Sequence, residues 1–116
     1  MSRIQGLIAE QLAYNYLIAQ GLQPITNNYQ CRVGEIDLIM RDGSFIVFIE
    51  VRSRTAKTFG SAAASISLVK QQKILKTAAY FLMYKYQDVP SRFDVLSIDG
   101  KNQKINWIKN AFGLNY

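Results

Sequence analysis

Residues 34–54 read GEIDLIMRDGSFIVFIEVRSR, and the architecture predicted for the whole chain follows from this segment. Apolar and polar residues alternate on both sides of Asp42-Gly43, which indicates a β-hairpin because a tight primed turn needs positive φ at its centre. Side chains alternate between the two faces of a strand. One face therefore carries acidic residues beside Ile39 and Phe48, and the other is apolar throughout, as in a central strand packed on both sides.

The acidic residues of the hairpin are predicted to share one face. A two-residue turn at Asp42-Gly43 places Asp37 opposite Phe48 and Glu35 opposite Glu50. Asp37 and Glu50 then become diagonal neighbours, roughly 7–8 Å apart at the backbone. Because carboxylates on a partly covered face repel one another, they need a cationic partner or must take up protons.

Asp37 and Glu50 together are expected to hold one hard cation, since Mg²⁺ binds oxygen ligands at about 2.0–2.1 Å. Arg52 lies on the same face and supplies part of the compensating charge. The other interpretation, an acidic face that is simply solvated, stays open from the pattern alone. We favour the metal site because Ile39 and Phe48 cover this face in part.

The composition points to one cytoplasmic domain with an anionic partner. The 116 residues form a single domain, 1–116, and 49% apolar residues can build a core. A formal charge of +6 favours nucleic acid as the partner. Without histidine and with Cys31 as the one cysteine, imidazole metal ligands, an imidazole base and an internal disulfide are excluded, and a hard metal held by oxygen is expected rather than zinc. No apolar run has membrane-spanning length and the N-terminus lacks a signal-peptide layout, so no membrane partner is expected.

The segments on both sides of the hairpin predict helices and further strands. Ser2 and Gln5 form a capping box for a helix that stops at Gly21, and Ser67 is the N-cap of a second helix. The expected order is a helix to about residue 20, an edge strand 22–32 with a bend at Asn27-Asn28, the hairpin 34–54, a loop 54–66, a helix 68–86, and strands 92–99 and 103–108. The fold class is therefore α/β, with a central sheet flanked by helices.

Polar residues outside the hairpin are further candidates for the site. Glu10 lies at the margin of the apolar stripe of the first helix, where it reaches the sheet or remains an ordinary surface glutamate. Gln71 lies in the apolar face of the second helix, so its amide needs a partner, either a catalytic group or the backbone. Asp94 is expected to have a structural role. Four basic residues suit phosphates or form a solubilising face, and they are Arg54, Lys57, Lys70 and Lys73.

The element order, the acid on the second strand and the Glu-x-basic motif of the third strand resemble the PD-(D/E)XK nuclease superfamily, which has a restriction-endonuclease-like core. More closely, the segments CRVGEIDLIMRDG, FIEVRSR, FGSAAASI and RFDVLSID are similar to the YraN-like proteins, expected endonucleases related to archaeal Holliday-junction resolvases. The resemblance covers nearly the whole chain. It implies an α-β-β-β-α-β-β order with a mixed sheet. The implied reaction is hydrolysis of phosphodiester bonds, in DNA rather than RNA and in branched DNA among its substrates. It also implies a homodimer.

The resemblance also implies roles for individual residues. Asp37, Glu50 and the carbonyl of Val51 would bind Mg²⁺ or Mn²⁺, and Glu10 would be an additional acid of the catalytic site. Gln71 is a further catalytic candidate from its place in the apolar face of the second helix, not from the resemblance. The expected chemistry is hydrolysis by a water that the cation activates.

Arg52 departs from the superfamily pattern, which has a lysine at this position. Arginine stays charged and cannot help to activate water by losing a proton, although its guanidinium can hold a phosphate. Lys57 or Lys70 would then have to stand in. The sequence therefore predicts a metal-dependent endonuclease weakened by Arg52, with a catalytically inactive nucleic-acid-binding module on the same fold as the alternative. A third hypothesis is an adaptor that binds other proteins and has neither activity.

Overall fold

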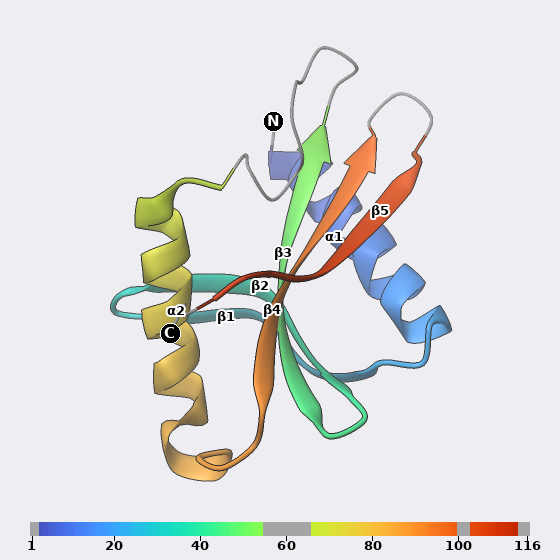
Figure 1. Cartoon of the computed structure of the whole chain (residues 1–116). Coiled ribbons are helices and arrows are strands. Elements are labelled where there is room, and N and C mark those ends of the chain that lie inside the picture. The colour runs from blue at the N-terminus through green and yellow to red at the C-terminus, as the bar shows by residue number, and fades with distance from the viewer. Residues whose placement is uncertain (1–2, 55–65, 100–102, 114–116) are drawn as a thin grey trace.

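The structure of the chain, a computed structural model, describes residues 3–54, 66–99 and 103–113. Within these residues the elements follow the predicted α-β-β-β-α-β-β order, which is confirmed (Figure 1). They are α1 (Arg3–Ala19), β1 (Gln23–Cys31), β2 (Gly34–Asp42), β3 (Phe45–Arg54), α2 (Leu68–Lys85), β4 (Ser91–Asp99) and β5 (Ile105–Phe112). The predicted N-cap Ser2 and residues 55–65, with Lys57, lie outside the described residues.

Five strands form one mixed sheet in the order β1-β2-β3-β4-β5. Neighbouring strands are antiparallel, except that β3 and β4 are parallel. Parallel neighbours need a crossover connection, and α2 lies in the connection between β3 and β4 (Figure 1). Residues 46–51 of the central strand β3 are all buried, as expected for a strand that is covered on both faces.

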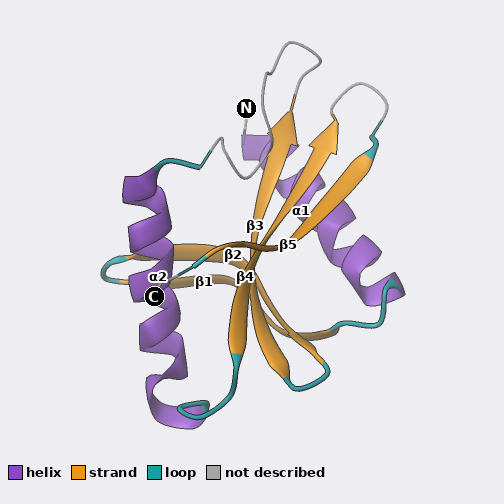
Figure 2. Ribbon diagram, in the orientation of Figure 1, coloured by secondary structure: helices purple, strands orange, loops and turns teal. Residues whose placement is uncertain are grey.

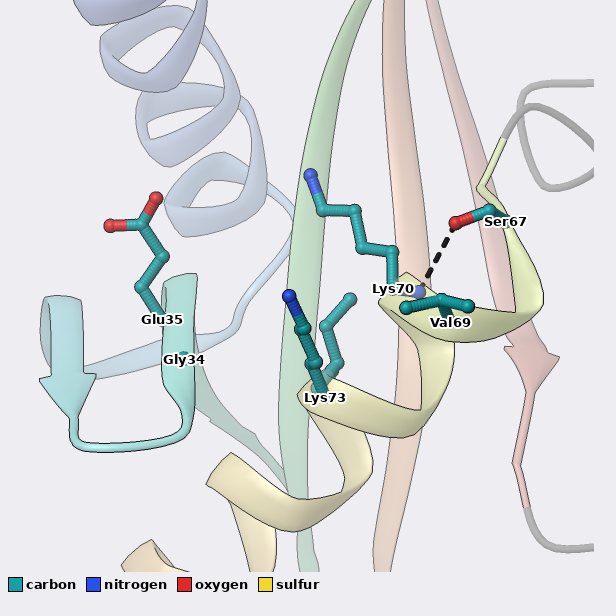
Figure 3. A pocket seen from close by; sticks show the side chains of 7 residues that line it. Gly34, Glu35, Ser67, Val69, Lys70 and Lys73 are labelled. Carbon is teal, nitrogen blue, oxygen red and sulfur yellow. Dashed lines mark hydrogen bonds between the residues drawn. The ribbon is translucent and has the colours of Figure 1, made fainter.

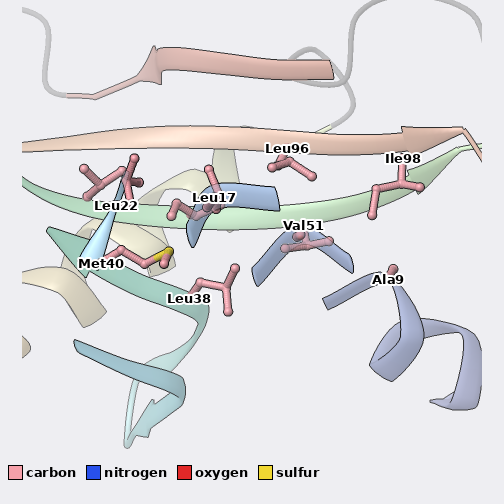
Figure 4. Close-up of a cluster of buried hydrophobic side chains, with 11 residues drawn as sticks. Ala9, Leu17, Leu22, Leu38, Met40, Val51, Leu96 and Ile98 are labelled. Atoms are coloured by element: carbon pink, nitrogen blue, oxygen red, sulfur yellow. The ribbon is translucent and has the colours of Figure 1, made fainter. Parts of the chain in front are cut away.

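The two helices pack on opposite faces of the sheet (Figure 2). Leu17 of α1 belongs to a buried cluster with Leu38 and Leu96 of the strands (Figure 4). On the other face, Ile74 of α2 is buried in a cluster that includes Phe48 of β3. Since both faces are covered, any polar side chain in the middle of the sheet needs a partner inside the protein.

The ends of the helices follow from local signals in the sequence. After α1, Gly21 has φ 99° and the N–H of Leu22 donates to the carbonyl of Leu17 at 3.1 Å, which is a Schellman ending. Before α2, the hydroxyl of Ser67 accepts the N–H of Lys70 at 3.1 Å, which confirms the predicted N-cap. Of the helices that the structure describes, none is long and apolar enough to span a membrane.

The hairpin forms, but its turn lies one residue later than predicted. Asp42 pairs with Phe45 and belongs to the strand, so the two turn residues are Gly43 and Ser44. Gly43 has φ 60°, the positive value that the first central residue of a type II′ turn requires. The Asp-Gly signal therefore identifies the hairpin correctly and misplaces its turn.

The later turn changes the partners of the acidic residues. The predicted pairings of Asp37 with Phe48 and of Glu35 with Glu50 are wrong, because Phe48 pairs with Ile39. The observed register, continued one step beyond the last pair that forms, brings Asp37 level with Glu50. The new register differs by two residues, so the apolar side chains of residues 38–51 keep the faces that alternation predicts. Ile36 is the exception, because it packs in the cluster of Ile39 and Phe48 rather than in the cluster of Leu38.

The β1–β2 ribbon bends sharply along its length (Figure 1). Asn28 lies level with Asp37 in the register of the two strands and has φ 54°, a left-handed conformation that asparagine tolerates. The predicted bend at this site is confirmed. Nearer the β1–β2 turn, α2 approaches so closely that a Cβ added to Gly34 would lie 2.9 Å from Oγ1 of Thr77. The position of α2 over this ribbon therefore depends on glycine at residue 34.

β5 is longer than predicted and ends at Phe112 rather than at residue 108. Asn110 has φ 53°, and the register with β4 shifts between Phe93 and Val95. This irregularity lets the strand continue past Ile108 to Phe112.

Candidate functional site

Asp37 lies where the pairing of β2 with β3 ends. The last backbone pair on this side joins Leu38 to Ile49. Beyond it, Oδ2 of Asp37 accepts a hydrogen bond from the N–H of Val51 at 2.8 Å. The carboxylate thus takes the place of a backbone acceptor and is fixed against β3.

Glu50 brings a second carboxylate to Asp37. Only 7% of Glu50 is exposed, which is unusual for a glutamate. Nζ of Lys70, on α2, lies 2.9 Å from its Oε1. The carboxyl groups of Asp37 and Glu50 are close enough to share a hydrogen bond. The structure therefore brings Asp37 and Glu50 together, and their role as metal ligands stays a prediction.

The surroundings raise the pKa of both carboxyl groups, and burial is the largest cause for each. The pKa of Glu50 rises from an ordinary value of 4.5 to about 7, with the charge of Asp37 as the second cause and Lys70 opposing the rise. The pKa of Asp37 is also raised, although the N–H of Val51 favours its charged form. The pair carries more negative charge than its surroundings neutralise, a condition that a bound cation would relieve.

Two further acidic residues lie around the pair. Glu10 of α1 is hydrogen-bonded to Asn28, and its pKa is raised first by burial and then by the charge of Asp37. Of the two interpretations of Glu10, the structure supports the one in which it reaches the sheet. Glu35 is exposed and accepts a hydrogen bond from Nε2 of Gln30 at 3.1 Å.

The donor set of the pair fits a small hard cation. Among the described residues, no three acidic or cysteine side chains converge closely enough to enclose a metal ion unaided. Mg²⁺ does not require such a cage, because it keeps several waters and commonly takes one or two carboxylates together with phosphate oxygens of the substrate. Asp37 and Glu50 supply two carboxylates, and an all-oxygen set favours Mg²⁺ or Mn²⁺ over softer metals.

The structure separates two neighbouring candidates on α2. Nζ of Lys70 reaches Glu50 while 43% of the Lys70 side chain remains exposed, so its predicted contact with phosphate stays a prediction. Gln71 donates from Nε2 to the carbonyl of Ile66 at 3.0 Å, which is the backbone alternative for its amide. Among the described residues, no hydrogen bond joins the Gln71 side chain to Asp37 or Glu50. A catalytic role of Gln71 therefore stays a prediction.

The remaining candidates lie on β3 and beside it. Arg52 follows Glu50 by two residues and is partly exposed. Val51 has a buried side chain in the cluster under α1 and offers its backbone to the site. Arg54 is the last residue of β3, and Lys73 is exposed on α2. Their proposed contacts with nucleic acid stay predictions.

Asn28 is a residue of the site that the sequence analysis missed. Its hydrogen bond with Glu10 links α1 to the bent ribbon beside Asp37. The signal was the pair of asparagines inside a predicted strand, because asparagine in a strand interior marks a left-handed residue more often than a packed one.

In the absence of divalent metal, we expect the protein to lose stability as the pH rises from about 5 to 8. The pKa of Glu50 is 4.5 when unperturbed and about 7 in the folded chain. Between these values the folded chain binds more protons than the unfolded chain, so raising the pH favours unfolding. The expected loss is about 1–3 kcal/mol, measured by urea unfolding in EDTA. Glu50→Gln removes the titrating group and should flatten the profile; an equal slope in that variant would contradict the assignment.

The five-stranded mixed sheet between two helices, with a carboxylate pair at its centre, defines a protein of the restriction-endonuclease-like fold class. Residues 9–98 match the sequence profile described as "Uncharacterised protein family UPF0102", and the chain belongs to this family. This is the family of the YraN-like proteins, so the resemblance found in the sequence is confirmed.

Relatives from several bacteria match over nearly the full length of the chain. A "UPF0102 protein" from Legionella pneumophila (strain Corby) is 58% identical over 114 residues, which covers 97% of each chain. A "UPF0102 protein" from Saccharophagus degradans is 51% identical and covers 95% of this chain and 93% of its own. A third, from Nitrosospira multiformis, is 44% identical and covers 98% and 97%. The chain and these relatives are thus similar throughout, and none of their names states an activity.

Proposed function

We propose that this protein is a metal-dependent endonuclease that hydrolyses phosphodiester bonds in nucleic acid, with DNA as the preferred substrate. The observation that carries the proposal is the Asp37–Glu50 pair, two adjacent carboxyl groups with raised pKa values between the layers of the fold. Such a pair destabilises the folded chain unless it is neutralised, so its presence calls for a functional reason. The proposal includes a homodimer, because a two-fold-symmetric protein matches the two-fold symmetry of branched DNA.

Asp37 and Glu50 would hold Mg²⁺ or Mn²⁺, with the carbonyl of Val51 as a third ligand. A bound cation of this kind supplies a Lewis acid for the phosphoryl oxygen and an activated water. The chain contributes orientation, because the N–H of Val51 holds Oδ2 of Asp37 at 2.8 Å and fixes the carboxylate beside Glu50. Glu10 lies on the α1 side of the pair, where its carboxylate would orient a water molecule.

Two side chains compete for the role of the lysine that the superfamily carries on this strand. Arg52 stands at that position in the sequence and stays charged at accessible pH. Lys70 comes from α2, and its Nζ lies 2.9 Å from Oε1 of Glu50. We assign to Lys70 the positive charge beside the scissile phosphate and to Arg52 a contact with the phosphodiester backbone. Lys73 and Arg54 are assigned further contacts with the nucleic acid.

A catalytically inactive nucleic-acid-binding module is the second candidate, and Arg52 is the observation that favours it. If deprotonation of a lysine at this position were essential for activating water, an arginine there would stop the reaction. The net charge of +6 would still support binding. The two candidates differ in whether any metal leads to cleavage.

The test is a cleavage assay on labelled branched, duplex and single-stranded DNA with Mg²⁺, Mn²⁺ or EDTA. An endonuclease cuts with metal and not in EDTA, whereas an inactive module binds in a salt-sensitive manner without cutting. Arg52→Lys is the informative variant, since a large gain in cleavage would mean that arginine weakens a nuclease. Absence of both cleavage and low-salt binding would overturn both candidates and leave an adaptor of other proteins.

Metal binding is expected to be measurable without cleavage. Mg²⁺ at about ten times its dissociation constant should raise the free energy of unfolding by about 1.4 kcal/mol at pH 8, since the cation binds only the folded pair. Glu50→Gln keeps the shape of the side chain and removes one ligand charge, so its stability should not respond. Thermal unfolding with and without Mg²⁺ measures both, and an equal response of the two proteins would exclude the pair as the metal site.

A further inference from the structure

A hollow of about 340 Å³ lies between the β1–β2 turn and the first two turns of α2 (Figure 3). Its wall on the ribbon side consists of Gly34 and Glu35, and its wall on the helix side contains Val69, Lys70 and Lys73. Its volume is at the lower end of the range of small-ligand sites. The hollow therefore has room for one small molecule or for one unit of a polymer, and not for a base pair.

The charges of the hollow suit one phosphate group. Lys70 and Lys73 are three residues apart, so they lie on the same side of α2, and Figure 3 shows both side chains extending along the hollow. The first turn of α2, which the structure describes in full, contains no acidic residue, so its N-terminal dipole adds to the positive charge. The acid on the opposite wall, Glu35, is already bonded to Gln30 and lies across the hollow from the lysines (Figure 3).

The other lining groups suit a sugar and a base. Val69 is 63% exposed, and Ile74 also lines the hollow, which gives it apolar surface against which a base can pack. Gly34 presents backbone without a side chain. Glu35 can accept a hydrogen bond from a sugar hydroxyl or a base amino group. Phosphate donors, an apolar surface and an acceptor therefore lie around one small space.

We infer that this hollow binds a single nucleotide unit of an unpaired strand, next to the bond that is cut. The inference rests on the proposed function and names its substrate class. Lys70 joins the two places, because it lines the hollow and its Nζ lies 2.9 Å from Oε1 of Glu50. A nucleotide whose phosphate contacts Lys70 and Lys73 would therefore lie beside the Asp37–Glu50 pair.

The hollow thereby favours substrates with splayed nucleotides over continuous duplex. A paired nucleotide cannot enter a space of this size without leaving its partner, and unpairing and unstacking cost a few kcal/mol. Flaps, frayed ends and the crossing points of branched DNA already carry unpaired nucleotides. Single-stranded and flapped oligonucleotides are thus expected to bind more tightly than duplex of the same length.

The test uses thymidine 3′,5′-bisphosphate as the probe, in EDTA and at low salt, with calorimetry of binding to the full chain. Lys73→Met removes one of the two phosphate contacts and should weaken binding about tenfold, the loss typical of one charge-assisted hydrogen bond. Lys76→Met is the matched control, because Lys76 lies one turn further along α2, is exposed and does not line the hollow. Its affinity should stay within about twofold of the wild type.

Three outcomes would overturn the inference: no binding of the probe at millimolar concentration, an equal loss in Lys73→Met and Lys76→Met, or tighter binding of duplex than of single strands. An equal loss would mean that the lysines act only as a general positive charge. Because the probe is bound in EDTA, these results do not depend on cleavage. Failure of the proposed function instead shows as an absence of cutting by a wild-type protein that still binds the probe.

Discussion

Replacing Asp37 with asparagine is expected to slow metal-dependent cleavage about 10²–10³-fold while the chain stays folded. Asparagine has the same shape, and its side-chain oxygen can still accept the N–H of Val51 that Asp37 binds at 2.8 Å. The substitution removes the negative charge, and a hard divalent cation depends on that charge. The loss should therefore appear in the rate of cleavage and in the affinity for Mg²⁺ together.

The same substitution is expected to leave the stability of the metal-free protein unchanged or to raise it. The charge of Asp37 is one cause of the raised pKa of Glu50, so removing that charge relieves a repulsion in the folded state. A carboxylate that served only to hold the fold together would behave in the opposite way, since its loss would leave donors unpaired. A variant that loses cleavage activity but keeps or gains stability therefore identifies Asp37 as a functional acid. A structural acid would lose stability as well.

Single-turnover cleavage and urea unfolding in EDTA measure the two effects on the same preparations. Asp42→Asn is the matched control, because Asp42 lies on the same strand and is ion-paired with Arg92 at 2.8 Å, away from the Asp37–Glu50 pair. It should cleave at the wild-type rate. Wild-type cleavage by Asp37→Asn, or an equal loss in the control, would remove Asp37 from the site.

The alternation of side chains in residues 34–54 predicted which residues share a face, and it could not predict which residues pair. Because the pattern repeats every two residues, moving the turn from Asp42-Gly43 to Gly43-Ser44 changes every partner without by itself moving a side chain to the other face. Asp37 and Glu50, which were predicted to be diagonal neighbours, therefore lie directly level with each other on the two strands. Face and composition are local properties of a strand, whereas register depends on the geometry of the turn.

The part of the site that comes from α2 was not predictable from helical spacing. Lys70 and Gln71 are adjacent in the sequence, and which of them meets Glu50 depends on the rotation of α2 against the sheet. That rotation is set by contacts between distant segments, such as the close approach of Thr77 to Gly34. The periodicity of a helix predicts its apolar stripe. A residue at the margin of the stripe can face either the sheet or the solvent, and periodicity does not decide which.

Asp94→Ala is expected to destabilise the protein by about 3–5 kcal/mol, as breaking a buried ion pair does. Asp94 is fully buried and accepts hydrogen bonds from Nε of Arg92 at 3.1 and 3.2 Å, Nε1 of Trp107 at 2.9 Å and the N–H of Asn110 at 2.9 Å. Alanine leaves these donors without their acceptor. Domains of this size have a total stability of about 5–15 kcal/mol, so the variant loses a large part of it.

Asp94→Asn keeps the measurement possible if the alanine variant does not fold. It retains one side-chain oxygen and loses the charge that faces Arg92, for an expected cost of about 1–3 kcal/mol. Trp107 is the single tryptophan of the chain and binds Asp94 directly, so its fluorescence during urea unfolding reports on this network. Asp88→Asn, at an exposed position, is the control and should change stability by less than about 0.5 kcal/mol.

The two acids differ because of the faces on which they lie. Asp94 pairs with Ile49, whose side chain is in the cluster under α1, whereas Glu50 pairs with Val95 in the cluster under α2. Both carboxylate oxygens of Asp94 already accept hydrogen bonds from Arg92, Trp107 and Asn110, so neither is left over for a metal ion. Asp94→Asn should therefore lower stability and keep the stabilisation by Mg²⁺ that Glu50→Gln loses. Loss of the Mg²⁺ response in Asp94→Asn while the protein remains folded would show that Asp94 belongs to the metal site.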